Sequence, residues 1–270
     1  MIPKLALIGC GAIGTEVLSR IDAAGTINRL AGILVRTSQL ERLRGTAAGR
    51  FAVVDGLDAL LELRPDLVVE CAGHAAVSDL GIDVLRQGTD LPVTSVGALA
   101  DDKLFADLCT ATQSGARLLI HSGAIAGIDG LRAARDAGLV AVRYSSIKPP
   151  QAWKATPAEK LIDLSAQREP AVFFDGTARE AALRYPQNAK VGATIAFAGI
   201  GLDRTRVKFV SDPRISGPLG IIEAESRLGN FRFEILAFAS KANPKTSLLA
   251  AHSIITAVDS GWVFSPFENS

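Results

Sequence analysis

The chain has 270 residues, of which 48% are hydrophobic and 21% charged, and its formal net charge at pH 7 is +1. A chain of this length can bury two modest hydrophobic cores, so we expect two domains. A charge balance this close to neutral provides no basic surface for nucleic acid or an anionic membrane, and we expect the protein to bind neither.

The three cysteines lack the C-x-x-C spacing of a zinc or redox site; they are Cys10, Cys71 and Cys109. We expect them to be reduced core residues, as in a cytoplasmic protein. No apolar run approaches the ~18 residues that a membrane span requires. The first apolar run leads into a glycine motif instead of a cleavage site, so we expect no signal peptide either.

A glycine motif directly follows the first predicted strand. Residues 4–8 are mostly apolar, residues 9–14 read G-x-G-x-x-G, and a helix is predicted from 15 to 24. In this context Gly9 allows a sharp turn, Gly11 lets the backbone approach a pyrophosphate, and Gly14 lets the helix pack against the strand. The alternative is a turn whose glycines are purely structural. The residues predicted to bind a dinucleotide here are Gly9, Gly11, Ala12, Ile13 and Gly14.

A second strand is predicted at residues 30–35, and the residues after it bear on cofactor choice. Enzymes strict for NAD usually place a carboxylate there to hold the ribose hydroxyls. This chain has Arg36 and Thr37, and a guanidinium with a hydroxyl suits a 2′-phosphate. The sequence therefore predicts NADP or NAD, with NADP slightly preferred, unless Arg36 is only a solvated residue.

Further strands are predicted at 51–54, 66–71, 92–96 and 118–121. They alternate with helical patterns, which predicts an α/β, Rossmann-type doubly wound parallel sheet over residues 1–120. Ala72, Gly73 and His74 follow one of these strands, at the sheet edge where such folds bind ligands. We predict that Ala72 and Gly73 border the cofactor. A helix cap or a structural imidazole would explain His74 equally well.

The pattern changes near residue 140. Strands are predicted at 140–148, 193–198, 206–210, 221–226 and 231–237, and a helix over 176–182. These short stretches predict an α+β domain on a mixed or antiparallel sheet over residues 121–242. Residues 243–270 are predicted to form a C-terminal helix that packs back on the first domain, with Pro244 near its start.

Six blocks together resemble the L-aspartate dehydrogenase family: E-C-A-G-H at 70–74, S-G-A-I-A-G at 122–127, F-D-G-T-A at 174–178, Y-P-Q-N-A at 185–189, G-L-D-R-T at 201–205 and N-P-K-T-S at 243–247. The resemblance implies a homodimer whose second domain carries the substrate site. It implies interconversion of L-aspartate with iminoaspartate, or oxaloacetate plus ammonia, using NAD(P). It also implies that Ala124 and Asn188 contact the cofactor.

One departure from that family concerns its catalytic histidine, which lies in an N-x-H pattern before an Ile/Val-Glu-Ala strand. Alignment on residues 222–224 places Pro218 at the asparagine and Gly220 at the histidine. Residues 211–230 contain no histidine. The proton relay has therefore moved, the substrate has changed, or the reaction has been lost.

Two residues are predicted to replace the missing acid/base group. His74 lies at a strand end on the cofactor side, and Lys190 can act as an acid if desolvation lowers its pKa. His121 can face the same cleft. We expect His252, in the C-terminal helix, to be a buried structural imidazole.

Other polar side chains are candidates for binding the substrate carboxylates: Lys148, Lys190, Lys245, Ser122, Thr177, Thr246 and Ser247. Solvated lysines and helix-capping hydroxyls are the alternatives to this interpretation.

The sequence leaves three candidate functions for a cytoplasmic protein with a small-molecule substrate. The first is an NAD(P)-dependent amino-acid dehydrogenase of the aspartate type. The others are a reductase for a different imine or 2-oxo acid, and a dinucleotide-binding protein without turnover.

Overall fold

The computed structural model describes residues 3–238, 248–260 and 264–266. The chain divides into two compact units: unit 1 is Met1–His121 with Ala251–Ser270, and unit 2 is Ser122–Ala250. Lys245, Thr246 and Ser247, together with Pro244, lie outside the described residues. Within the described residues, no helix combines the length and the apolar character needed to cross a bilayer.

Unit 1 contains a six-stranded parallel sheet. Its strands are β1 (Leu5–Ile8), β2 (Leu30–Leu34), β3 (Ala52–Val54), β4 (Leu67–Glu70), β5 (Leu91–Val93) and β6 (Leu118–Ile120). They lie in the order β3-β2-β1-β4-β5-β6, which is the doubly wound order with a switch point between β1 and β4. Every residue of β1 and β4 is buried, because helices cover both faces of such a sheet. The predicted fold class is confirmed.

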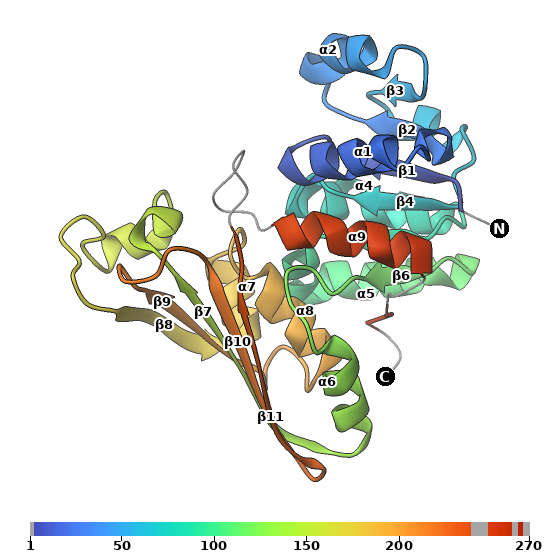
Figure 1. Ribbon diagram of the computed structural model, residues 1–270. Helices are drawn as coiled ribbons and strands as arrows, with labels where there is room; N and C mark the ends of the chain where they lie inside the picture. The colour runs from blue at the N-terminus through green and yellow to red at the C-terminus, as the bar shows by residue number, and fades with distance from the viewer. Residues whose placement is uncertain (1–2, 239–247, 261–263, 267–270) are drawn as a thin grey trace. The chain divides into compact units, whose positions relative to one another are not determined.

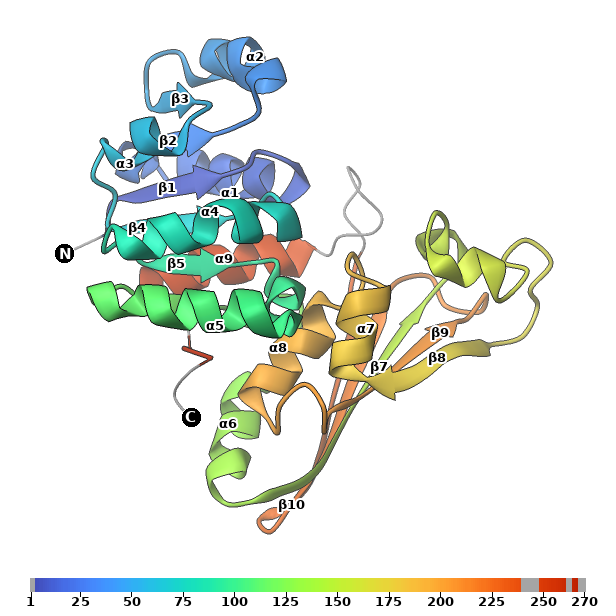
Figure 2. The same ribbon diagram turned by 180° about the vertical axis from the view of Figure 1, so that it is seen from behind.

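The helices of unit 1 are α1 (Ala12–Ala23), α2 (Thr37–Ala47), α3 (Leu57–Leu61), α4 (His74–Arg86), α5 (Asp102–Ala111) and α9 (Leu248–Ser260). α1 and α9 lie in front of the sheet in Figure 1, and α4 and α5 cover its opposite face in Figure 2. The core on the α1 side joins Leu7 of β1, Val17 of α1 and Ile254 of α9. Burying side chains of this size stabilises the unit by roughly 1.5–3 kcal/mol each.

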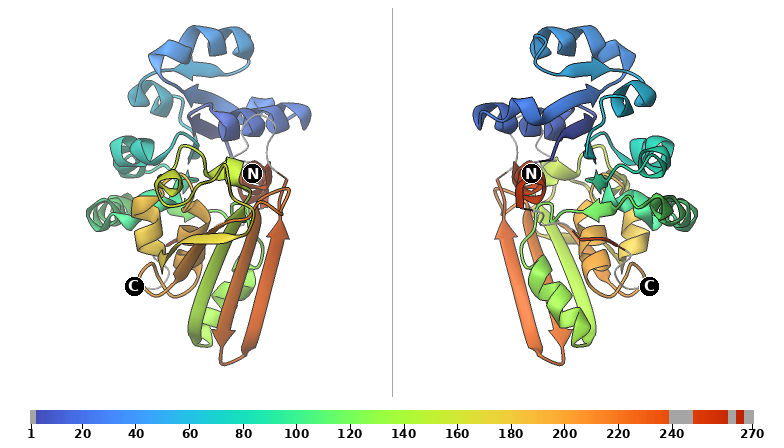
Figure 3. Two further views of the ribbon diagram at one scale, coloured as in Figure 1. Left: turned by 90° about the vertical axis from the view of Figure 1, so that its left-hand side faces the viewer. Right: turned by 90° about the vertical axis from the view of Figure 1, so that its right-hand side faces the viewer.

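Unit 2 contains a five-stranded mixed sheet in the order β11-β10-β7-β9-β8. Its strands are β7 (Leu139–Lys148), β8 (Ala171–Thr177), β9 (Arg206–Ser211), β10 (Leu219–Ser226) and β11 (Gly229–Leu236). β7 pairs parallel with β9 and antiparallel with β10. The helices are α6 (Ile128–Asp136), α7 (Ala178–Arg184) and α8 (Lys190–Ala198). They cover one face of the sheet, and Figure 3 (left) shows the strands from the other face.

Three expectations about local structure were wrong. Residues 193–198 lie in α8, not in a strand, because a short apolar run that is buried all round shows no period that separates the two. β5 ends at Val93, where the Thr94 amide is shared between the Glu70 carbonyl oxygen and its buried carboxylate and the Ser95 amide donates to the carboxylate alone. The helix predicted from residue 176 begins at Ala178, where Thr177 and Glu180 form a capping box.

The cysteines divide into two kinds. Cys10 and Cys71 are buried, as expected, whereas Cys109 is only half-buried. Burial raises the pKa of the Cys109 thiol, which disfavours its reactive thiolate form.

Candidate active site

The turn between β1 and α1 leaves no room for side chains at two of its glycines. Gly9 has φ +94°, and a Cβ there would stand 2.7 Å from the Cβ of Ala72. A Cβ on Gly14 would stand 2.4 Å from the carbonyl oxygen of Gly9. The helix therefore begins in direct contact with the strand, and the turn also contacts the end of β4.

The third glycine of this turn has open space in front of it. A Cβ on Gly11 would meet nothing within 4 Å. α1 begins at Ala12, with Gly11 as its N-cap and no acidic residue in its first turn. The first amides of a helix have no partner within it, and together with the helix dipole they attract phosphate. The turn, with Ala12 and Ile13 at the helix start, fits the pyrophosphate of a dinucleotide.

A guanidinium group follows β2 and a carboxylate follows β3. Arg36 is exposed and immediately precedes α2. Thr37 Oγ1 donates a hydrogen bond to Asp55 Oδ2 at 3.0 Å. Asp55 follows β3, whose Val54 pairs with Leu34 of β2. The sequence interpretation missed this carboxylate, although parallel pairing of consecutive strands places their following residues side by side.

The end of β4 brings Ala72 and Gly73 close to the glycine turn. Gly73 has φ +126° and precedes α4. The amides of Ala72 and Gly73 donate to Glu70 Oε1 at 2.7 and 2.6 Å. His74 is the first, half-buried residue of α4. The predicted cofactor residues of β1 and β4 therefore lie together at one edge of the sheet.

In unit 2, a lysine is held between an amide and an aromatic ring. Lys148 Nζ donates to Asn188 Oδ1 at 3.1 Å and lies 4.8 Å from the centroid of the Trp153 ring. Trp153 is fully buried and Asn188 is 8% exposed. A cation over a desolvated ring is held electrostatically, and an ammonium group fixed in this way can bind a carboxylate.

Two more predicted residues lie in unit 2. Lys190 is the half-buried first residue of α8, two positions after Asn188. Ala124 is half-buried, in the turn that contains Gly123 and Gly127 at φ +68° and +78°. His74 and Arg36 belong to unit 1, so the predicted site residues are divided between the units.

Gly220 lies on β10 directly opposite Ser146 of β7. A Cβ on Gly220 would stand 3.4 Å from Tyr144 Oη. Tyr144 is 5% exposed, and burial raises the pKa of its hydroxyl to about 12 against a smaller opposing effect of a hydrogen bond with Ser146. Sequence reasoning missed Tyr144, although the two-residue period of β7 places it on the inward face with Ser146 and Lys148.

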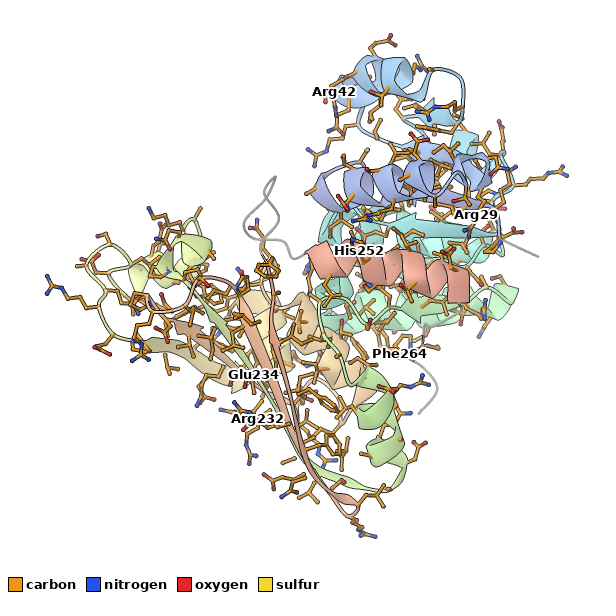
Figure 4. The ribbon with its side chains drawn as sticks, viewed as in Figure 1. Arg29, Arg42, Arg232, Glu234, His252 and Phe264 are labelled. Atoms are coloured by element: carbon orange, nitrogen blue, oxygen red, sulfur yellow. The ribbon has the colours of Figure 1, made fainter. Side chains whose placement is uncertain are left out.

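The other histidines are placed within unit 1. His252 is not buried: its side chain is 41% exposed on α9, and Nε2 lies 3.8 Å from Glu16 Oε1 (Figure 4). Its apolar sequence neighbours face the core, while a helical period turns position 252 toward solvent. His121 is 3% exposed, and its Nδ1 lies 2.7 Å from Ser253 Oγ.

A doubly wound parallel sheet, a glycine turn open above a helix N-terminus and a second mixed-sheet unit define a nicotinamide-dinucleotide-binding dehydrogenase class. Two family descriptions match the chain: "Homoserine dehydrogenase, NAD binding domain" over residues 9–121 and "Aspartate dehydrogenase, C-terminal" over residues 129–261.

Similar proteins extend over almost the whole chain. It is 44% identical to L-aspartate dehydrogenase 2 of Bordetella bronchiseptica over 261 residues, covering 96% of each chain. It is 41% identical to L-aspartate dehydrogenase of Acinetobacter baumannii, covering 94% of this chain and 95% of the other. The crystal structure of aspartate dehydrogenase from Thermotoga maritima has the same fold, with a TM-score of 0.74, 23% identity and 96% coverage of each chain. The chain belongs to the L-aspartate dehydrogenase family.

Proposed function

We propose that the chain interconverts L-aspartate and iminoaspartate with NAD(P), the imine exchanging with oxaloacetate and ammonia. The observation that carries this proposal is the 44% identity to an L-aspartate dehydrogenase across 96% of both chains. In the oxidative direction the C–H bond of the amino-acid carbon breaks as its hydride leaves, and the nitrogen loses a proton to form the imine. Water then adds to the imine carbon, releasing ammonia.

Each part of this chemistry has a candidate group in the chain. A bound nicotinamide supplies the hydride acceptor. The amides at the start of α1 and the loop at Ala72 and Gly73 bind the cofactor, and Lys148 holds a substrate carboxylate in unit 2. Ala124 and Asn188 also contact the cofactor. His74 and Lys190 are the proposed proton-transfer groups, since position 220 offers no side chain.

The choice between NADP and NAD rests on the ends of β2 and β3. Arg36 favours a 2′-phosphate, whereas the Asp55 carboxylate, held by Thr37, suits free ribose hydroxyls. We propose that the enzyme uses both cofactors with a slight preference for NADP.

Among the described residues of unit 2, the helices lie on one face of the sheet, and the other face supports a homodimer. Cross-strand pairing aligns an aliphatic residue from each strand on this face: Val172, Val210, Ile147, Leu219 and Leu236. The outer two are 55% and 60% exposed. Charged pairs lie on the same face, including Arg232 with Glu234 at 3.1 Å (Figure 4). We propose that two copies of this cytoplasmic protein join here. Light scattering measures the molar mass of the wild type and of Leu236→Arg. We expect a lower mass for the variant, and an unchanged mass would contradict the proposed interface.

The proposed reaction is tested by following NADPH and NADH oxidation with oxaloacetate and ammonium. Turnover on the order of 1–10³ per second supports it. Turnover only with other 2-oxo acids or amines would identify a different substrate. Cofactor binding without turnover on any substrate would identify a non-catalytic protein and contradict the proposal.

A further inference from the structure

The last residue of β4 is a buried acid. Glu70 is 1% exposed at the carboxyl end of a strand that is otherwise apolar. A carboxylate removed from water is costly unless protein donors replace the lost hydrogen bonds. Its surroundings therefore indicate what this position does.

Five neutral donors from two loops surround this carboxyl group. Oε1 accepts from the amides of Ala72 at 2.7 Å and Gly73 at 2.6 Å, and from Ser95 Oγ at 3.1 Å. Oε2 accepts from the amides of Thr94 at 3.2 Å and Ser95 at 2.9 Å. Four of the donors are backbone amides, which only donate, so an acceptor at both oxygens is required.

These hydrogen bonds connect the ends of two neighbouring strands. Glu70 pairs with Val93 of β5 in parallel register. β5 ends at Val93. The Thr94 amide then donates to both the carbonyl oxygen and the carboxylate of Glu70, and the Ser95 amide donates to the carboxylate. Hydrogen bonds from amides to a charged acceptor are stronger than those to a neutral one. One side chain thus sets the position of the loop after β4 relative to the loop after β5.

The two loops lie in a defined half of the dinucleotide site. In the order β3-β2-β1-β4-β5-β6, the half built from β1 to β3 carries Arg36 and the glycine turn, where the adenosine end binds. The half built from β4 to β6 receives the nicotinamide end. Contact between Gly9 and Ala72 brings the loop after β4 to the switch point between the halves.

We propose that Glu70 is a positioning residue that shapes the nicotinamide half of the cofactor site by holding the loops after β4 and β5 on one buried carboxylate. The inference rests on the cofactor use in the proposed function but not on the identity of the amino-acid substrate. Glu70 does not itself touch the reacting atoms. It acts through the backbone of Ala72, Gly73, Thr94 and Ser95.

Glu70→Gln tests this proposal because the amide keeps the size of the side chain but turns one acceptor into a donor. We expect NADPH and NADH to bind about 10- to 100-fold more weakly, as for loss of hydrogen bonds to a charged group. Binding of adenosine 2′,5′-bisphosphate, which occupies only the adenosine half, should change less than about twofold, because that half is built from other strands. Calorimetric titration of the purified full chain measures the affinities for the cofactors and for the adenosine fragment.

Glu62→Gln is the matched control, since Glu62 is exposed at the end of α3 and the change of charge is the same.

A second variant keeps the test valid if Glu70→Gln does not fold. Ser95→Ala removes only the hydroxyl that donates to Oε1, and we expect a smaller loss of NADPH affinity in the same direction. Equal weakening of NADPH and the adenosine fragment, or no weakening of NADPH in either variant, would overturn the proposal. A wild-type chain that binds neither nicotinamide cofactor would overturn it as well. A chain that binds NADPH but does not act on aspartate would contradict the proposed substrate alone and leave this test intact.

Discussion

Tyr144 Oη lies 3.4 Å from the position that a Cβ on Gly220 would occupy. The tyrosine ring therefore borders the space into which a longer side chain at this position would extend. Because Gly220 pairs with Ser146 across β7 and β10, this space is on the helix-covered face of the unit 2 sheet. The alignment on residues 222–224 assigns the family's histidine to position 220, and it therefore predicts that the phenol of Tyr144 borders that position in this chain.

Gly220→Ala should fold normally. A Cβ at 3.4 Å makes an ordinary contact, and alanine restricts the unfolded chain, which stabilises by about 0.4–1 kcal/mol at an unstrained site. We expect urea unfolding to show unchanged or slightly higher stability and NADPH affinity to stay the same. A large loss of NADPH binding would show that Gly220 does not belong to the substrate end of the site.

Gly11→Ala and Gly14→Ala should separate cofactor binding from folding. A Cβ on Gly11 projects into open space, so the variant should keep its melting temperature and bind NADPH at least about 10-fold more weakly. A Cβ on Gly14 overlaps the Gly9 carbonyl, and we expect a loss of about 1–3 kcal/mol in unfolding free energy. Calorimetric unfolding and cofactor titration measure the two effects. The glycine roles assigned above would be wrong if both variants lost stability equally.

Arg36→Ala should weaken NADPH binding by about 10-fold while changing NADH little, because only NADPH has the 2′-phosphate. Asp55→Asn should act in the opposite sense, raising NADPH affinity as a carboxylate is removed from beside the phosphate. Dissociation constants for both cofactors measure the ratio. Equal effects on NADPH and NADH would refute the role of Arg36.

Lys148→Met should raise the KM for aspartate and oxaloacetate by about 10-fold or more, since a charge-assisted hydrogen bond to a carboxylate is lost. Methionine retains much of the packing over Trp153. Cofactor affinity measured by titration should change far less than the KM. Lys154→Met, at an exposed position, is the control. A parallel loss in both lysine variants would indicate a general effect of surface charge.

Tyr144 should make stability fall at high pH. Burial raises its pKa from 10.0 to about 12, so between these values the folded state retains a proton that the unfolded state loses. Its contribution is fully present below about pH 10 and is lost as pH rises toward about 12, by at most roughly 3 kcal/mol. Urea unfolding of wild type and Tyr144→Phe at pH 9 and pH 11 isolates it. A difference between the two proteins that stays constant with pH would contradict the shift.

Part of the site was predictable from local pattern. The roles of the glycines at 9, 11 and 14 could be predicted because they depend only on the steric fit of one turn between a strand and the next helix. Apolar runs likewise located the strands of unit 1. Residues 193–198 were not predictable in this way, since an apolar run buried on every side carries no helical or strand period.

Relations between distant residues could not be read in advance. Asp55 was not recognised beside Thr37, nor Tyr144 beside Gly220, because cross-strand register decides both contacts. Lys148 and Asn188 were each singled out, but their hydrogen bond joins positions 40 residues apart. Residues 94–96 were wrongly predicted to continue a strand. The amides of Thr94 and Ser95 donate to Glu70 across 24 and 25 residues, and no local pattern reveals contacts at that separation.

The sequence by itself determined the dinucleotide turn, the alternation of strands and helices in unit 1 and the family to which the chain belongs. These depend on steric and hydrophobic rules that act within a few residues, and on motifs preserved in order along the chain. Tertiary structure alone decided that Glu70 accepts amides from two loops, that Asn188 holds Lys148 and that Tyr144 faces Gly220. Such contacts arise from strand order and register, which bring together side chains whose separation along the chain carries no signal.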